Sequence, residues 1–281
     1  MLLTLNTTSL QYQLNRQSAD NSLSLADLPE FTLQKLLLRG LVIDTALLKG
    51  WNLDDLHTLR NRADQAGCPC LVLRETMPIE MNINKIADDE PIIKRLSLVA
   101  RAAHRLGCNA MTIRLHAALD DGGMDRTADF LRSLMLRIER MELNLLLEPW
   151  EGDLDEPEVL INLIKKVGGF RIGTMPNFAH AIAHQDIDGC LQQTAPYAGA
   201  ILASCGLGTG SRSTTSKKKS KAPAAGKALL KKELADIRSC MNAIRKVGYA
   251  QILAIDYIGP GNGIRAIEQT RDIIDEILDS K

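Results

Sequence analysis

The sequence predicts a single (β/α)₈ barrel, in which eight parallel strands alternate with helices around one closed sheet. Eight short apolar runs with strand character recur along the 281 residues. From residue 41 onward, most successive runs are separated by a segment with helical periodicity and a charged face. The runs are apolar at nearly every position, which is typical of parallel strands that helices cover.

The expected strands are LLTL at 2–5, LVID at 41–44, CLVL at 70–73, AMTIRL at 110–115, LNLLLE at 143–148, FRIG at 170–173, AILAS at 200–204 and QILAID at 251–256. The clearest helical patterns cover 53–67, 90–107, 126–141, 156–168 and 263–278, and the first helix is expected to begin near Leu25. Glycine follows several of these patterns, where a left-handed residue ends a helix at no steric cost. An open doubly wound sheet is the competing architecture, but it usually has fewer strands, and the chain lacks its glycine-rich first turn.

Residues 206–232 interrupt this alternation between the seventh strand and the helix that follows it. The segment contains eight Lys or Arg and no Asp, Glu or aromatic residue. It cannot bury enough apolar surface to become ordered by itself, so we expect a flexible Lys-rich insertion in an otherwise single domain spanning 1–281. Residues near 207–226 are expected to be mobile, with the next helix starting around Ala228. A solvated loop is favoured over a phosphate-binding one, because no aromatic platform accompanies the lysines.

The composition limits the partners of the chain. Lys plus Arg and Asp plus Glu each number 34, so no overall field favours nucleic acid, which is therefore an unlikely partner. No apolar run approaches the ~20 residues of a membrane span, and no signal-peptide pattern is visible, so we expect a cytoplasmic protein without a membrane partner. The six cysteines form no CxxC pair and are expected to be buried thiols. A homo-oligomer remains open.

A barrel carries its reactive groups at the carboxyl ends of its strands. Glu148 and Asp256 are the sharpest candidates there, because each ends a mostly apolar strand. A buried carboxylate is costly unless a metal, a hydrogen-bond network or a basic side chain compensates it, and Arg114 is a candidate partner. A catalytic or metal-binding role and a structural ion pair both remain open for this pair.

Further polar residues follow other expected strands. Asn177 and His180 would point the same way on a helical turn, although a lone histidine more often caps or packs than catalyses. His184 is expected on the solvated surface. His116 is a candidate for substrate binding or for a hydrogen bond to a loop carbonyl. Trp150 would lie over the barrel mouth, where it stacks on a sugar or shields the core.

Glu148 ends strand five, Asn177 and His180 form an N-x-x-H motif after strand six, and Asp256 ends strand eight. This ordered set resembles the xylose isomerase-like barrel superfamily. That group includes sugar and sugar-phosphate isomerases and epimerases and the abasic-site endonuclease. The resemblance runs from about residue 35 to the C-terminus and is clearest at 143–168 and 246–259.

The resemblance implies a divalent metal held by Glu148, Asn177 and Asp256. Asn177 replaces the Asp of the family's D-x-x-H motif, Asp256 replaces its last Glu, and only Ser204 or Cys205 stands where the family has a histidine. Such an oxygen-rich set suits Mg²⁺ or Mn²⁺ better than Zn²⁺, and a site without metal is also open.

The function implied is a divergent sugar or sugar-phosphate isomerase or epimerase, in which Glu148 and Asp256 move a proton between adjacent carbons. Arg114, His116, Trp150 and His180 would then bind the substrate. The alternative is a catalytically degenerate barrel that binds a carbohydrate or serves as a regulatory or scaffolding protein. Repair of abasic DNA is disfavoured, because its metal site needs more histidines than this chain supplies.

Overall fold

The computed structural model describes residues 1–15, 23–81, 89–119, 122–206 and 223–280, with main chain alone at 89 and 223–231. The strands are β1 (Leu2–Asn6), β2 (Leu41–Asp44), β3 (Cys70–Arg74), β4 (Ile79–Met81), β5 (Ala110–Ala117), β6 (Asn144–Glu148), β7 (Ile172–Thr174), β8 (Ala200–Cys205) and β9 (Ile252–Tyr257). Their pairings are parallel and follow the order β7-β6-β5-β3-β2-β1-β9-β8, with β4 paired to β5 alone.

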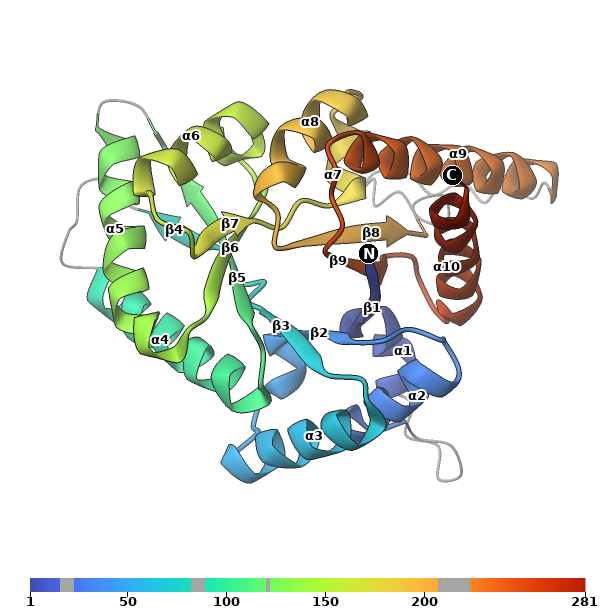
Figure 1. The fold of residues 1–281 in the computed structure, drawn as a ribbon, viewed down its shortest axis with the longest axis horizontal. Coiled ribbons are helices and arrows are strands. Elements are labelled where there is room, and N and C mark those ends of the chain that lie inside the picture. The colour runs from blue at the N-terminus through green and yellow to red at the C-terminus, as the bar shows by residue number, and fades with distance from the viewer. Residues whose placement is uncertain (16–22, 82–88, 120–121, 207–222, 281) are drawn as a thin grey trace, which may run out of the picture.

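The two ends of this order meet, so the sheet curls into a barrel (Figure 1). The Gly199 amide donates to the Thr174 carbonyl at 3.1 Å, and the Leu202 amide donates to the Pro176 carbonyl at 2.9 Å. These bonds join the chain after β7 to β8. The expected (β/α)₈ barrel is therefore confirmed.

Helices lie around the outside of the sheet (Figure 1). They are α1 (Gln11–Leu14), α2 (Leu28–Gln34), α3 (Leu53–Ala66), α4 (Asp89–Leu106), α5 (Gly123–Ile138), α6 (Pro157–Val167), α7 (Phe178–Ala183), α8 (Ile187–Thr194), α9 (Pro223–Lys246) and α10 (Ile264–Asp279). Local signals set the ends of α3: a capping box of Asn52 and Asp55 begins it, and Gly67 ends it at a φ of 67°. Of the helices described, none has the length and apolar composition needed to span a membrane.

Two details differ from the sequence-based expectation. Strand β4 was not expected, because it has only three residues and the middle one, Glu80, is exposed. Helix α9 begins at Pro223 rather than around Ala228. Proline and alanine are both favourable at a helix start, which accounts for the earlier beginning. Residues 207–222 of the predicted mobile insertion lie outside the described part of the chain.

The barrel interior is apolar at one level and polar at the next. The inner apolar cluster consists of strand residues and of Met175, which directly follows β7: Val42, Val72, Ala110, Leu146, Met175, Ala200, Leu202 and Ala254. Side chains two positions apart on a strand point to the same face. The next inward positions are accordingly Asp44, Arg74, Thr112, Glu148, Ser204 and Asp256, all of which are buried. Six strands, β2, β3, β5, β6, β8 and β9, therefore present polar side chains at the same end of the barrel.

Barrel closure depends on the absence of a side chain at residue 173. A Cβ atom at Gly173 would overlap the carbonyl oxygen of Tyr197, which belongs to the backbone that leads into β8. We predict that Gly173→Ala lowers the free energy of unfolding by about 1–3 kcal/mol, because β7 and this backbone must move apart. Urea denaturation measures the change. Ser239→Ala on the exposed side of α9 is the control and should stay within about 0.5 kcal/mol of wild type. A Gly173→Ala protein as stable as wild type would contradict this packing.

Candidate functional site at the barrel mouth

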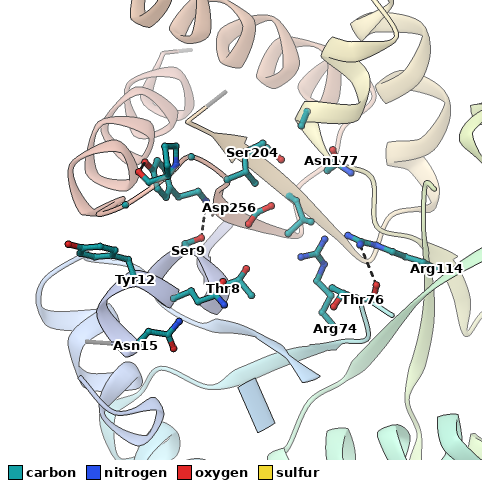
Figure 2. Close-up of a pocket in the computed structure, with 18 residues that line it drawn as sticks. Thr8, Ser9, Tyr12, Asn15, Arg74, Thr76, Arg114, Asn177, Ser204 and Asp256 are labelled. Atoms are coloured by element: carbon teal, nitrogen blue, oxygen red, sulfur yellow. Dashed lines mark hydrogen bonds between the residues drawn. The ribbon is translucent and has the colours of Figure 1, made fainter. Parts of the chain in front are cut away.

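A pocket of about 890 Å³ opens at the carboxyl ends of the strands (Figure 2). Its lining is mostly polar and includes Thr8, Ser9, Tyr12, Asn15, Arg74, Thr76, Arg114, Asn177, Ser204 and Asp256. The volume lies within the range of small-molecule sites. Segments from both ends of the sequence form it, because β1 lies beside β9 in the barrel.

An ion cluster centred on Glu148 forms the base of one wall. Arg74 Nε and Nη2 donate to Oε1 and Oε2 of Glu148 at 2.6 and 2.9 Å. Arg114 Nε donates to Oε2 at 2.8 Å, and the Thr112 hydroxyl donates to Oε1 at 2.7 Å. The side chain of Glu148 has no exposed surface. Four donor atoms therefore satisfy one buried carboxylate.

Strand register brings these four residues together. Arg74 of β3 pairs in register with Thr112 of β5, and Arg114 of β5 pairs with Glu148 of β6. Thr112 and Arg114 are two positions apart on β5, so both point toward the same neighbours. The cluster is thus a direct product of three adjacent parallel strands.

The charges of the cluster stabilise one another. Burial by itself raises the pKa of Glu148, but the charge and hydrogen bonds of Arg74, the charge of Arg114 and the Thr112 hydroxyl outweigh it, and the pKa lies below its usual value. Burial likewise disfavours the charge on Arg74, yet the pKa of Arg74 is raised, because the Glu148 charge compensates. Glu148 and Arg74 are therefore both charged at neutral pH.

The opposite wall carries Asp256 of β9. Asn6 Nδ2 donates to Asp256 Oδ1 at 2.7 Å and is also 2.8 Å from Thr8 Oγ1. Ser204 of β8 is in register with Asp256 and lines the same pocket. In Figure 2 the guanidinium groups of Arg74 and Arg114 point into the space that Asp256 borders. The pocket thus combines cationic donors on one side with an acidic acceptor on the other.

The metal ligands implied by the resemblance do not fit a divalent cation here. Both oxygens of Glu148 already accept hydrogen bonds from guanidinium groups, whose positive charges would repel a metal at that carboxylate. Asn177 Oδ1 accepts a hydrogen bond from the His180 amide at 2.6 Å and caps α7. The expectation of Mg²⁺ or Mn²⁺ at Glu148 is therefore not supported by the contacts of these side chains.

The other expected site residues separate into two groups. Arg114, Asn177 and Asp256 line the pocket, whereas Glu148, His116, Trp150 and His180 are absent from its lining. Trp150 covers Arg114, whose Cζ lies 4.4 Å from the centre of the ring, so it shields the ion cluster.

The two histidines face acidic side chains outside the pocket. Nδ1 of His116 is 2.7 Å from Oε2 of Glu80, and the side chain is 46% exposed. Nε2 of His180 is 2.6 Å from Oδ1 of Asp155, and His184 contacts the other oxygen of that carboxylate. His184 therefore pairs with Asp155 and does not lie on the solvated surface that the sequence predicts for it.

Sequence reasoning missed Arg74 and Asn6 as site residues. Each ends an apolar strand, which is the signal that singled out Glu148 and Asp256. A buried arginine needs an anionic partner as much as a buried glutamate needs a cation. The pairing of Glu148 with Arg114, which the sequence left open, is present.

Comparison with solved structures places the whole chain in one fold. The probable 3-DHS dehydratase AsbF of Bacillus anthracis superposes with a TM-score of 0.70 at 13% identity, over 100% of both chains. A D-psicose 3-epimerase of Clostridium cellulolyticum, solved with D-tagatose, gives 0.65 at 14% identity over 99% of this chain and 98% of its own. The IolI protein, solved with a binding zinc atom, gives 0.69 at 14% identity over 99% and 96%. At these identities the likeness concerns the fold.

No curated protein matches the sequence. A family model does match it, and its description is the xylose isomerase-like TIM barrel, aligned with residues 40–277. This range includes eight of the nine strands and lacks only β1. The chain therefore belongs to the xylose isomerase-like TIM barrel family.

Proposed function

We propose that this chain binds a sugar or sugar phosphate in the mouth pocket without a divalent metal at Glu148. The observation that carries the proposal is the pairing of Glu148 with two arginines. The resemblance assigns this carboxylate to a metal, but here it accepts hydrogen bonds from two guanidinium groups and holds them in position. This proposal corresponds to the carbohydrate-binding alternative that the sequence left open.

The hydrogen-bonding groups of the pocket suit an oxygen-rich ligand. Within the described residues, Glu148 accepts hydrogen bonds from Nε and Nη2 of Arg74 and from Nε of Arg114. The Thr76 carbonyl accepts from Nη1 of Arg114. One terminal nitrogen of each guanidinium is left to donate to a ligand. Asp256 has Oδ1 bonded to Asn6 and Oδ2 without a bond inside the described chain, so it can accept from a hydroxyl group. Alternating donors and acceptors of this kind match the hydroxyl groups of a sugar.

Proton transfer by two carboxylates is disfavoured. A general base needs an oxygen that can accept a proton near neutral pH. The oxygens of Glu148 are engaged by four donor atoms, and its pKa is lowered, so it is a poor base.

A second candidate is a metal-independent isomerase or epimerase that uses Asp256 alone as the base. The observation that favours it is the position of Asp256 across the pocket from Arg74 and Arg114, two cations that would stabilise a developing enediolate. The fold neighbours include a D-psicose 3-epimerase and a 3-keto-D-glucoside 4-epimerase, which is consistent with this chemistry.

Ligand titration tests the binding proposal. Isothermal titration calorimetry with ketoses and with their phosphates should give binding in at least one series, and comparison of the two series decides whether the arginines select a phosphate. We predict that Asp256→Asn weakens binding about tenfold or more, because a hydrogen bond to a charged acceptor contributes about 1.5–3 kcal/mol.

The matched control is Asp27→Asn, which changes an exposed aspartate paired with Arg62 away from the pocket. It should bind like wild type. The absence of binding in both series, or equal affinity of the Asp256→Asn and wild-type proteins, would contradict the proposal. NMR of the same mixtures detects turnover, and epimerisation that Asp256→Asn abolishes would favour the second candidate.

The role of Glu148 can be tested by stability. We predict that Glu148→Gln lowers the free energy of unfolding by about 3–5 kcal/mol at pH 7, because the buried guanidinium of Arg74 and the partly buried guanidinium of Arg114 lose their counter-ion. The pKa of Glu148 is lower in the folded state than the ordinary 4.5, so its stabilisation is complete above that pH and is lost as the pH falls below it. The difference between the two proteins should therefore shrink in acid.

Urea denaturation between neutral and acidic pH measures this difference. Glu90→Gln is the control, because Glu90 pairs with Arg137 on the surface with a side chain 65% exposed. That variant should differ from wild type by less than about 1 kcal/mol. A Glu148→Gln protein as stable as wild type at pH 7 would show that the ion pairs do not hold this wall together.

A further inference from the structure

A second cluster of polar side chains lies between the loop after β6 and helix α7. It consists of Asp155, the last residue of the short 3₁₀ helix Asp153–Asp155, together with His180 and His184. Nε2 of His180 is 2.6 Å from Oδ1 of Asp155, and Nε2 of His184 is 3.0 Å from Oδ2. The two imidazole rings have centroids 4.4 Å apart. Both histidines therefore direct the same ring nitrogen at one carboxylate.

We propose that Asp155, His180 and His184 bind a transition-metal ion, with Zn²⁺ as the best match. The site is separate from the mouth pocket, because none of the three residues lines it. It is also distinct from the Glu148, Asn177 and Asp256 set that the family resemblance implies. The proposal does not depend on sugar binding.

The spacing of the ligand atoms suits one metal ion. The ligand atoms, one from each of the three residues, lie within 4.8 Å of one another. Ligands of a tetrahedral zinc ion with bonds near 2.0–2.1 Å are roughly 3.3 Å apart. One bound ion would lengthen the observed contacts of 2.6 and 3.0 Å, which go to different oxygens of Asp155, by about 0.7 and 0.3 Å. The remaining separations, all within 4.8 Å, would shorten by at most about 1.5 Å through side-chain rotation.

The backbone presents the two histidines together. His180 and His184 are four residues apart, so they lie one above the other on the same side of the helical turn. Asn177 accepts a hydrogen bond from the His180 amide and fixes the beginning of α7. The side chains of His180 and His184 are 14% and 22% exposed, so a bound ion would be partly shielded from solvent. The site is therefore largely formed before any metal binds.

The donor set selects among metals. Two imidazole nitrogens and one carboxylate are typical ligands of zinc and related first-row metals, whereas Mg²⁺ prefers oxygen ligands. Three protein ligands leave a fourth position of the tetrahedron open. A cavity of about 10 Å³ adjoins Asp155 and His180, close to the smallest space that holds one water molecule. Water is the expected fourth ligand.

The metal would fasten two segments at the rim of the mouth. Asp155 lies in the loop that also carries Trp150, which covers Arg114. Helix α7 carries His180, is followed directly by His184 and begins after Asn177, which lines the pocket. A metal that joins Asp155 to α7 would hold the Trp150 loop in place, so its expected role is structural.

Metal titration of the full chain tests the proposal. Protein freed of metal by chelator and dialysis is titrated with Zn²⁺ by calorimetry, and with Co²⁺ while the visible absorption of tetrahedral Co²⁺ is recorded. We expect one ion per chain and tetrahedral Co²⁺ bands. His184→Ala and Asp155→Asn should each weaken Zn²⁺ binding at least tenfold, because each removes one of three protein ligands.

His57→Ala is the matched control, since His57 is an exposed histidine on α3, and it should bind Zn²⁺ like wild type. Asp256→Asn should also retain Zn²⁺ binding, which separates this site from the mouth pocket. Circular dichroism establishes that the variants are folded, and Asp155→Asn preserves the shape of the side chain. Failure of wild type to bind Zn²⁺ at micromolar concentrations, or unchanged binding by both His184→Ala and Asp155→Asn, would overturn the proposal.

Discussion

Glu148 brings a negative charge into the barrel interior, where an unpaired carboxylate would cost several kcal/mol, and two arginines on neighbouring strands compensate it. The arrangement requires β3, β5 and β6 to be adjacent and in register. It also requires an apolar layer beneath, formed by residues such as Val72 and Leu146, which keeps water from the base of the cluster. The chemistry of the mouth follows from this pairing, because it determines which donors and acceptors remain for a ligand.

The sequence predicts most of the fold because each strand is nearly continuous in apolar residues and each is followed by a helical pattern. The eight expected runs correspond to strands β1, β2, β3, β5, β6, β7, β8 and β9. Strand β4 escapes such reasoning, since three residues with an exposed centre give no measurable alternation. Helix α9 begins earlier than the sequence predicts, because the helix-forming residues at the end of the preceding basic segment are not distinguished from it by composition.

The site was only partly predictable, and the reason is physical. Glu148 and Asp256 stand out because a carboxylate that ends an apolar strand is costly, and the same reasoning suggested Arg114 as a partner. The second guanidinium, from Arg74, depends on which strands become neighbours and in which register, and neither property is local in the sequence. Asp155 gave no signal, because it lies in a short turn among other acidic residues. His184 was assigned to the surface because a sequence does not reveal which loop covers a helix.

The most direct test of the role of Glu148 is a crystal structure of the protein soaked in Mn²⁺, with anomalous scattering recorded to locate the metal. The predicted result is that guanidinium nitrogens of Arg74 and Arg114 lie within hydrogen-bond distance of both Glu148 oxygens and that no anomalous peak appears at that carboxylate. A manganese peak bonded to Glu148, with the arginines displaced from it, would contradict the assignment of Glu148 as their structural counter-ion.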